Sequence, residues 1–352
     1  MRRARPGGAR AAGDSLLERV TALGTAGHVL DYDDTYLPGI AHLSAPVAPA
    51  AVAVGAAAGA TAGDVLRAYA RGFEAMGALA RAGHPALYDR GWHPTAVCGG
   101  VGAAVAAAAL LEAPVDAAVA LAAVRASGLR AAFGSDGKSL QVGLAATSGV
   151  AAAQLAAAGA RLPLDRVAAA WRDAYGGDWA SPGAGPLAIE GNWIKAWPCC
   201  LQTHGAIECA DRVGAVPEGE IVVLAHPVSR QAAGFDDVDT PLQAKFSIPY
   251  ITAFTLLHGG PRVDSFAALD EAVRRLASTI EVRTDPALGE SEFALLADGR
   301  ELARVDAARG SPQHPLSAGD LRAKVRNLAG SRLDGVLDDA ARPAAELLAA
   351  LA

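Results

Sequence analysis

Lysine is rare in this sequence, and its positions are the first indication of chemistry. Only four of the 31 basic residues are lysines, namely Lys138, Lys195, Lys245 and Lys324. Lys138 and Lys195 lie in loop-like contexts, FGSDGKSLQVG and NWIKAWPCC, where a compact ammonium group can hold a carboxylate. We therefore expect functions for Lys138 and Lys195. Lys324 lies on a predicted helix face, where a solvated surface residue is expected.

A second group of polar residues is the run Asp31-Tyr32-Asp33-Asp34-Thr35, which His42 follows. If this run is helical, Asp31 and Thr35 lie on one face because they are four residues apart. A carboxylate and a hydroxyl so placed could orient a substrate or hold a histidine. An exposed acidic turn is the alternative.

A third candidate is His93, within the run Tyr88-Asp89-Arg90-Gly91-Trp92-His93-Pro94. Pro94 and the Gly/Ala-rich segment after it predict that a helix begins directly after His93. The positive end of that helix favours a neutral imidazole, which could act as a general base near pH 7. A purely structural histidine is the alternative.

Cofactor and metal motifs lack support. The four cysteines show no CxxC spacing, which argues against zinc and iron–sulfur sites. Gly100-Val101-Gly102 resembles part of a dinucleotide fingerprint, but no strand is predicted before it. The chain also lacks a GxSxG elbow, a Walker loop and an HExxH motif. We therefore expect neither cofactor nor metal.

Composition narrows the class of protein. The net charge of −6 and the lack of a basic run beyond Arg2–Arg3 argue against nucleic-acid binding. The N-terminal residues 1–14 are basic without an apolar segment after them, so we expect no signal peptide and a cytoplasmic location. Val142–Leu162 approaches membrane length, but alanine dominates it and polar residues interrupt it. We expect a packed helix there and no membrane partner.

The predicted elements indicate a mainly α fold with a smaller α+β domain. Alanine-rich segments near 62–82, 95–112, 115–126, 143–159 and 164–175 predict helices. Residues 220–225 and 279–284 predict strands, with a helix near 264–277, and 293–305 predicts a hairpin around Asp298-Gly299. Ser317 and Asp320 form a capping box for a further helix. The expected organisation is a helical domain over 1–192, an α+β domain over 193–312, and a C-terminal return to the helical domain over 313–352.

Six segments, in order along the chain, resemble the MmgE/PrpD family. They are DYDDTYLPGIAHLS (31–44), YDRGWHPTAVCGGVGAAVAAA (88–108), FGSDGKSLQVGLAATSGVAAAQLAAAG (133–159), KAWPCCLQTH (195–204), KFSIPYITAFTLLHG (245–259) and HPLSAGDLRAKVRNLAG (314–330). The family includes 2-methylcitrate dehydratases, cis-aconitate decarboxylases and iminodisuccinate epimerases. The resemblance implies a discontinuous helical body with an α+β lid, and a homodimer without metal or organic cofactor.

The resemblance also implies roles for individual residues. Those matching family positions at the site are Asp31, Thr35, His42, His93, Lys138, Lys195, His204 and Tyr250. Of these, His42, His93, Lys138 and Tyr250 are expected to be catalytic. Asp31, Thr35, Lys195 and His204, with Lys138 again, are expected to bind substrate. The sequence departs from the family pattern at Leu43, which replaces a proline. It also departs at Leu37 and Cys200, where decarboxylase-like members can carry histidine.

The resulting hypothesis is a cofactor-independent hydro-lyase that eliminates water from a hydroxy di- or tricarboxylate. The lysines would stabilise an enediolate, one histidine would remove the proton, and the other histidine or Tyr250 would protonate the leaving hydroxyl. The sequence does not assign the two histidines. Decarboxylation and epimerisation stay open as alternatives that use the same pocket. A catalytically dead binding protein and an aconitase-like iron–sulfur enzyme are the remaining alternatives.

Overall fold

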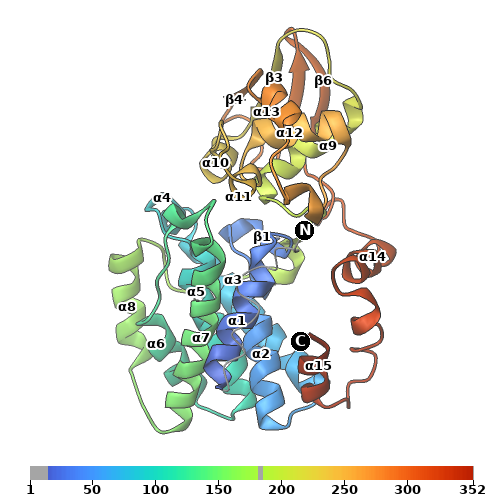
Figure 1. Ribbon diagram of the computed structural model, residues 1–352. Coiled ribbons are helices and arrows are strands. Elements are labelled where there is room, and N and C mark those ends of the chain that lie inside the picture. Colours follow the sequence, from blue (N-terminus) through green and yellow to red (C-terminus); the bar gives the residue numbers. More distant parts are fainter. Residues whose placement is uncertain (1–14, 181–184, 352) are drawn as a thin grey trace.

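The computed structural model describes residues 15–180 and 185–351. Figure 1 shows a helical body and, above it, a smaller domain that contains the main sheet. The chain is mainly helical, as predicted. The body helices are α1 (Leu16–Val29), α2 (Ser44–Ala58), α3 (Ala62–Gly83), α4 (Ala86–Asp89), α5 (Pro94–Leu110), α6 (Val115–Ala123), α7 (Gly137–Ala157) and α8 (Leu164–Tyr175).

Small side chains allow the body helices to pack closely. An added methyl group at Gly149 of α7 would lie 2.4 Å from the carbonyl oxygen of Gly100 in α5. A methyl group at Gly143 of α7 would lie 2.4 Å from the carbonyl oxygen of Thr21 in α1. These backbones approach within a distance that excludes any larger residue. The alanine- and glycine-rich composition thus lets α7 pack closely against both α5 and α1.

A two-stranded sheet connects the first third of the chain to the middle. Strand β1 (Asp34–Tyr36) pairs antiparallel with β2 (Asn192–Ile194), and Asp34 lies opposite Ile194. Neither strand was predicted, because each has only three residues. Their pairing places Lys195, the residue after β2, beside the turn at 31–33.

The smaller domain is built around a four-stranded mixed sheet in the order β4-β3-β5-β6. Strand β3 (Ile221–Ala225) is parallel to β4 (Ile280–Thr284) and antiparallel to β5 (Phe293–Ala297). Strand β6 (Arg300–Val305) completes the predicted hairpin, in which Asp298 and Gly299 both have positive φ. The helices of this domain are α9 (His204–Val213), α10 (Pro227–Ala232), α11 (Pro241–Ala244), α12 (Ile248–His258) and α13 (Glu271–Ala277).

The last two helices lie beside the body, at the right of Figure 1. Helix α14 (Ala318–Ala329) begins with the predicted capping box of Ser317 and Asp320. Helix α15 (Ala344–Leu351) contacts α2, because the N–H of Ala344 donates to the carbonyl of Ala60 just beyond α2. The domain boundaries at 192 and 312 stay a prediction.

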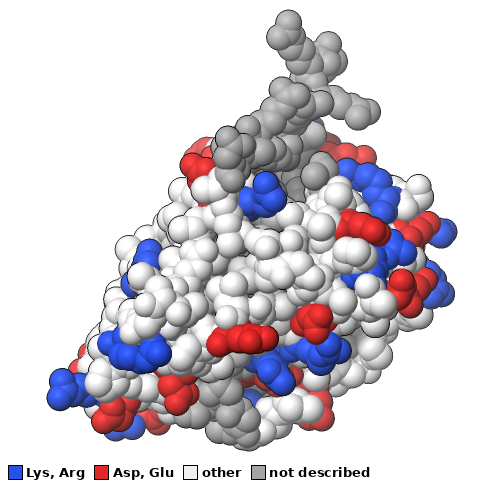
Figure 2. Space-filling model, turned by 90° about the horizontal axis from the view of Figure 1, so that it is seen from below, with Lys and Arg blue, Asp and Glu red and all other residues white. Residues whose placement is uncertain are grey.

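Two surface features concern the expected partners. Helix α7 is long and apolar enough to cross a membrane, but 56% of its most apolar window is buried inside the protein. In Figure 2, which views the molecule from below, Lys and Arg side chains are interspersed with Asp and Glu around a broad uncharged centre. The described residues on that face therefore form no continuous basic patch.

Candidate active site

Asp31 lies at the centre of a buried cluster of charges. It follows α1 in the left-handed conformation, with φ of 53°, and its side chain accepts a hydrogen bond from the Lys138 ammonium. The Lys195 ammonium lies 3.0 Å from the same carboxylate oxygen and also donates to the backbone carbonyl of Asp31. Burial alone would raise the pKa of Asp31, but Lys138 and Lys195 outweigh burial and hold it well below its ordinary value. Asp31 is therefore an ionised anchor for both lysines.

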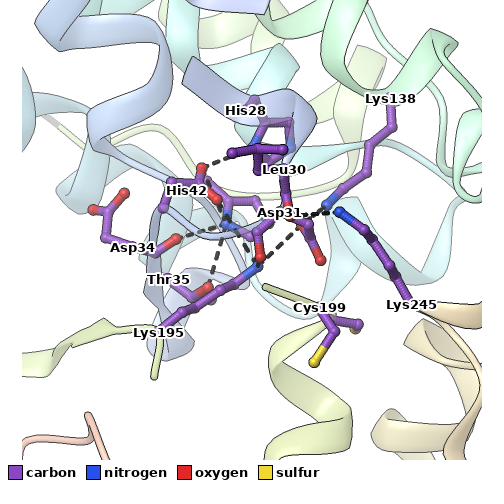
Figure 3. Close-up of polar contacts among 12 residues, drawn as sticks. His28, Leu30, Asp31, Asp34, Thr35, His42, Lys138, Lys195, Cys199 and Lys245 are labelled. Carbon is purple, nitrogen blue, oxygen red and sulfur yellow. Dashed lines mark hydrogen bonds and ion pairs between the residues drawn. The ribbon is translucent and has the colours of Figure 1, made fainter. Parts of the chain in front are cut away.

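The ammonium groups of the other two lysines bond to backbone carbonyls next to Asp31 and at Lys195. Lys245 donates to the carbonyl of Leu30, and Lys324 donates to the carbonyl of Lys195. Lys324 also lies 4.0 Å from the centre of the Tyr32 ring, and burial lowers its pKa to about 8. The expectation of a solvated Lys324 is therefore wrong, because α14 directs its side chain toward the site. Figure 3 shows Lys138, Lys195 and Lys245 converging on Asp31 and Leu30.

The charge balance of this cluster favours an anion. Its four ammonium groups face three buried carboxylates, those of Asp31, Asp33 and Asp34. Burial raises the pKa of Asp34 to about 6, so its carboxylate is mostly ionised at pH 7. Both oxygens of Asp34 accept from the N–H of Ser44, at the start of α2. One positive charge is thus left without a partner in the cluster, and a small anion could neutralise it.

His42 lies just before α2 and is held by three contacts. Its Nδ1 is 2.7 Å from the carbonyl oxygen of Asp34 and 3.3 Å from Oγ1 of Thr35. Its backbone N–H donates to Oγ1 of Thr95 in the first turn of α5. Burial lowers the pKa of His42 well below its ordinary value, although Asp33 opposes the shift. His42 is therefore a neutral imidazole at pH 7.

Asp31 and Thr35 reach the site by a different route from the one predicted. The segment is not helical: Asp31 lies in a turn, and Thr35 lies in β1. The hypothesis of one helix face is wrong because the left-handed Asp31 redirects the chain after α1. Both side chains nevertheless line the same cavity, since β1 runs along one of its walls.

His93 is the N-cap residue of α5, as the sequence indicates. Its Nδ1 is 2.6 Å from Nε2 of Gln141, and its ring packs edge-on against Phe133. Burial, together with the charge of Lys138, lowers the pKa of His93 well below its ordinary value. The imidazole is neutral as predicted, but burial is the main cause.

His28, which the sequence did not indicate as a site residue, belongs to the same cluster. Its Nδ1 is 2.7 Å from Oδ2 of Asp33, and its ring centre lies 4.6 Å from that of His42. Burial lowers the pKa of His28, so it too is neutral at pH 7. The contact between His28 and Asp33 joins residues five apart across the turn after α1, so no helical i, i+3 or i, i+4 spacing indicated it. This contact holds the Asp33 carboxylate 3.7 Å from Nδ1 of His42.

A cavity of about 40 Å³ lies between the body and the smaller domain. Six of the eight predicted site residues line it: Asp31, Thr35, His42, His93, Lys138 and Lys195. Its other walls are largely apolar and include Leu37, Ile40, Phe133, Leu201 and Phe246. Cys200 and Tyr88 also line it. The cavity therefore combines a cationic, histidine-bearing side with an apolar side.

Two predicted site residues lie elsewhere. Tyr250 is buried in the smaller domain, where its hydroxyl accepts a hydrogen bond from the N–H of Asp270 at the start of α13. His204 is fully buried at the start of α9 against the Trp197 ring, and burial lowers its pKa to about 3. Neither lines the cavity. The structure therefore does not place Tyr250 as a proton donor or His204 as a substrate ligand.

One group among the described residues has the spacing of a metal site, namely His28, Asp33 and His42. Its members already bond to each other or to the backbone, since Nδ1 of His28 is on Asp33 and Nδ1 of His42 is on the Asp34 carbonyl. The Lys195 ammonium also lies 3.9 Å from Asp33. A cation there would be repelled by Lys195, so hydrogen bonding explains these three residues better than metal binding.

Comparisons with known proteins agree with this architecture. The MmgE/PrpD N-terminal domain matches residues 16–175, and the MmgE/PrpD C-terminal domain matches residues 197–349. The human protein cis-aconitate decarboxylase is 28% identical over 348 residues, which cover 88% of this chain and 72% of that protein. Since the two domain matches together span most of the sequence, this chain belongs to the MmgE/PrpD family.

Proposed function

We propose that the protein is a lyase that removes a proton next to a carboxylate of a small carboxylic acid. The reaction proposed is elimination of water from a hydroxy di- or tricarboxylate. The observation that carries the proposal is the buried cavity in which Lys138, Lys195, His42 and His93 meet beside an uncompensated positive charge. Membership of a family that includes lyases supports the reaction class.

The cluster fits the difficulty of that reaction. A C–H bond beside a carboxylate is weakly acidic, because removing its proton creates an enediolate with two negative charges. Lys138 and Lys195 are fixed by Asp31 in a buried site, where a preorganised ammonium stabilises such charge more strongly than water does. His42 and His93 are neutral and line the same cavity, and a neutral imidazole can accept a proton or donate a hydrogen bond.

The cavity is small for a bound acid. Ligand pockets usually enclose about 300–1,000 Å³, whereas this cavity encloses about 40 Å³. Its walls come from the body, through His42 and His93, and from the segments leading into the smaller domain, through Leu201 and Phe246. We infer that the smaller domain acts as a lid, which opens to admit the acid and closes to exclude water.

Decarboxylation is the second candidate. It is favoured by the similarity to cis-aconitate decarboxylase, and it would use the same cationic pocket. Leu37 and Cys200 both line the cavity at positions where decarboxylase-like members can carry histidine, which favours dehydration. Epimerisation would instead need two acid–base groups on opposite faces of one carbon.

One experiment separates these reactions. The purified protein is incubated in deuterated water with a panel of hydroxy, unsaturated and amino di- and tricarboxylates, and products are followed by NMR. Dehydration predicts an alkene formed with loss of water; decarboxylation predicts release of CO₂, and epimerisation predicts inversion with deuterium uptake. If one acid binds tightly but none is turned over, the protein is a binding protein and the proposal is wrong.

We also propose that the protein is a cytoplasmic homodimer that needs no metal and binds neither nucleic acid nor membrane. These proposals rest on the family resemblance and on the composition. Light scattering of the purified protein tests the dimer, and dialysis against a chelator tests the metal. A monomer, or activity lost on chelation and restored by a divalent cation, would contradict them.

A further inference from the structure

We propose that His42 is the proton acceptor of this site, that His93 is its neutral hydrogen-bond donor, and that Gln141 is a positioning residue that sets the His93 tautomer. This inference rests on the proposed function and deepens it. It follows from the hydrogen-bond partners of the two imidazoles, which differ in chemical type.

The tautomer of His42 is set by a backbone carbonyl. The nearest polar atom to its Nδ1 is the carbonyl oxygen of Asp34, at 2.7 Å, and a carbonyl oxygen only accepts. The carboxylate of Asp33, 3.7 Å from the same nitrogen, also favours a proton there. Nδ1 of the neutral ring therefore carries the hydrogen, and Nε2 carries the lone pair. His42 lines the cavity, so this lone pair is available as a base.

The tautomer of His93 is set by a side-chain amide whose orientation is itself fixed. The carbonyl oxygen of Gln141 accepts from the N–H of Leu129 at 2.9 Å, and its amide nitrogen donates to the Leu129 carbonyl at 3.2 Å. The same amide nitrogen, which only donates, lies 2.6 Å from Nδ1 of His93. Nδ1 of the neutral His93 ring must accept, and Nε2 must carry the hydrogen.

This Nε2–H group of His93 lacks a partner. Nε2 is buried, and within residues 15–180 and 185–351 it makes no hydrogen bond. A buried donor without a partner costs about 1–3 kcal/mol, so a ligand that supplies an acceptor would be favoured there. Because His93 lines the cavity beside Lys138, that acceptor is an oxygen of the substrate.

These tautomers give the two histidines different parts in the elimination. Nε2 of His42 takes the proton from the carbon beside the carboxylate, and the C–H electron pair forms the new carbon–carbon double bond through the enediolate. The C–O bond breaks and its electron pair leaves with the hydroxyl oxygen. That oxygen receives the proton held by His42 and departs as water, which returns His42 to its neutral form. His93 keeps its proton throughout. Its Nε2–H donates a hydrogen bond to a negatively charged oxygen of the substrate, as a neutral imidazole can.

The first test needs no substrate. Long-range ¹⁵N–¹H NMR spectra of the ¹⁵N-histidine-labelled enzyme at pH 7 report which ring nitrogen carries hydrogen, and His42→Asn and His93→Asn assign the signals. We expect hydrogen on Nδ1 of His42 and on Nε2 of His93. The opposite tautomer at either ring, or a charged imidazolium at either ring, would overturn the proposal.

The second test exchanges the donor at residue 141 for an acceptor. In Gln141→Glu the carboxylate accepts from Nδ1 of His93, so the spectra should show the hydrogen moved away from Nε2 and kcat should fall about 10²-fold, with a smaller change in KM. Gln141→Met, which offers no hydrogen bond, should leave a mixture of tautomers. The control is Gln154→Glu, the same change at an exposed position of the same helix, which should alter neither spectrum nor kcat. An unshifted His93 tautomer in Gln141→Glu would refute the role of Gln141.

Failure of this inference and failure of the proposed function are distinguishable. If the tautomers are as described but no carboxylic acid is turned over, the assignment of the hydrogen atoms stands and the proposed reaction falls. If a carboxylic acid is turned over but the tautomers are reversed, the reaction stands and the roles of the histidines are wrong.

Discussion

Replacing Asp31 by asparagine removes the one carboxylate that holds both Lys138 and Lys195. Asp31→Asn keeps the shape of the side chain but leaves two buried ammonium groups without their shared partner. Breaking a buried ion pair from one side typically costs about 3–5 kcal/mol. At about 2–4 °C per kcal/mol for domains of this size, the melting temperature should fall by roughly 6–20 °C.

The pH dependence of this loss follows from the direction of the Asp31 shift. The pKa of Asp31 is held well below the ordinary 3.8 in the folded protein. Its stabilisation is therefore fully present above pH 3.8 and is lost as the pH falls through the folded value. The difference in stability between wild type and Asp31→Asn should be constant from pH 5 to pH 8 and shrink below pH 4.

Asp31→Asn should affect substrate binding and turnover differently. The uncompensated charge of the cluster rises from one to two, so an anionic substrate should bind no more weakly, while kcat should fall about 10²-fold because the lysines lose their fixed positions. Thermal unfolding and steady-state kinetics measure both effects, with Asp173→Asn, an exposed change on α8, as the control. If Asp31→Asn matches the control in stability and in kcat, Asp31 does not hold the two lysines in place.

Three further predictions concern residues around the site. Tyr250→Phe should change kcat/KM less than twofold and cost about 1 kcal/mol of stability. The reason is that its hydroxyl accepts from the Asp270 N–H away from the cavity. A hundredfold loss of kcat would instead show that Tyr250 is catalytic. Lys324→Met removes a charge-assisted hydrogen bond to the Lys195 carbonyl, worth about 1.5–3 kcal/mol, and should lower kcat/KM about tenfold. Kinetics equal to wild type would show that Lys324 on α14 does not support the site. His204 has its pKa lowered from 6.5 to about 3, so the native state loses stability as the pH falls below 6.5. Between pH 6.5 and pH 4.5 this amounts to about 2–3 kcal/mol, and urea midpoints should show that His204→Asn loses less stability over that range than wild type.

Much of the fold could be predicted because its signals are local. Alanine-rich segments, the Asp298-Gly299 turn and the capping box at Ser317 each depend on neighbouring residues, and the structure confirms all three. Strands β1 and β2 could not be predicted, since three-residue strands exist only because each finds the other across about 160 residues of chain.

Most residues of the site could be predicted from the sequence, but their hydrogen-bond partners could not. The scarcity of lysine indicated Lys138 and Lys195, yet Lys324 was assigned to solvent because nothing in its helix shows that α14 contacts residue 195. The role of Gln141 was equally hidden, although it lies three residues after Lys138 on the same helix. Tertiary structure alone brings Gln141 to Nδ1 of His93 and the Leu129 backbone to the Gln141 amide.

A crystal structure with a bound polycarboxylate, taken from the acids that the protein turns over, would show whether Lys138 and Lys195 hold the substrate. We predict a substrate carboxylate within hydrogen-bond distance of the Lys138 and Lys195 ammonium groups. We also predict the reacting carbon beside Nε2 of His42 and a substrate oxygen on Nε2 of His93. An acid bound outside this cavity, or bound inside it with its carboxylates away from both lysines, would contradict the account.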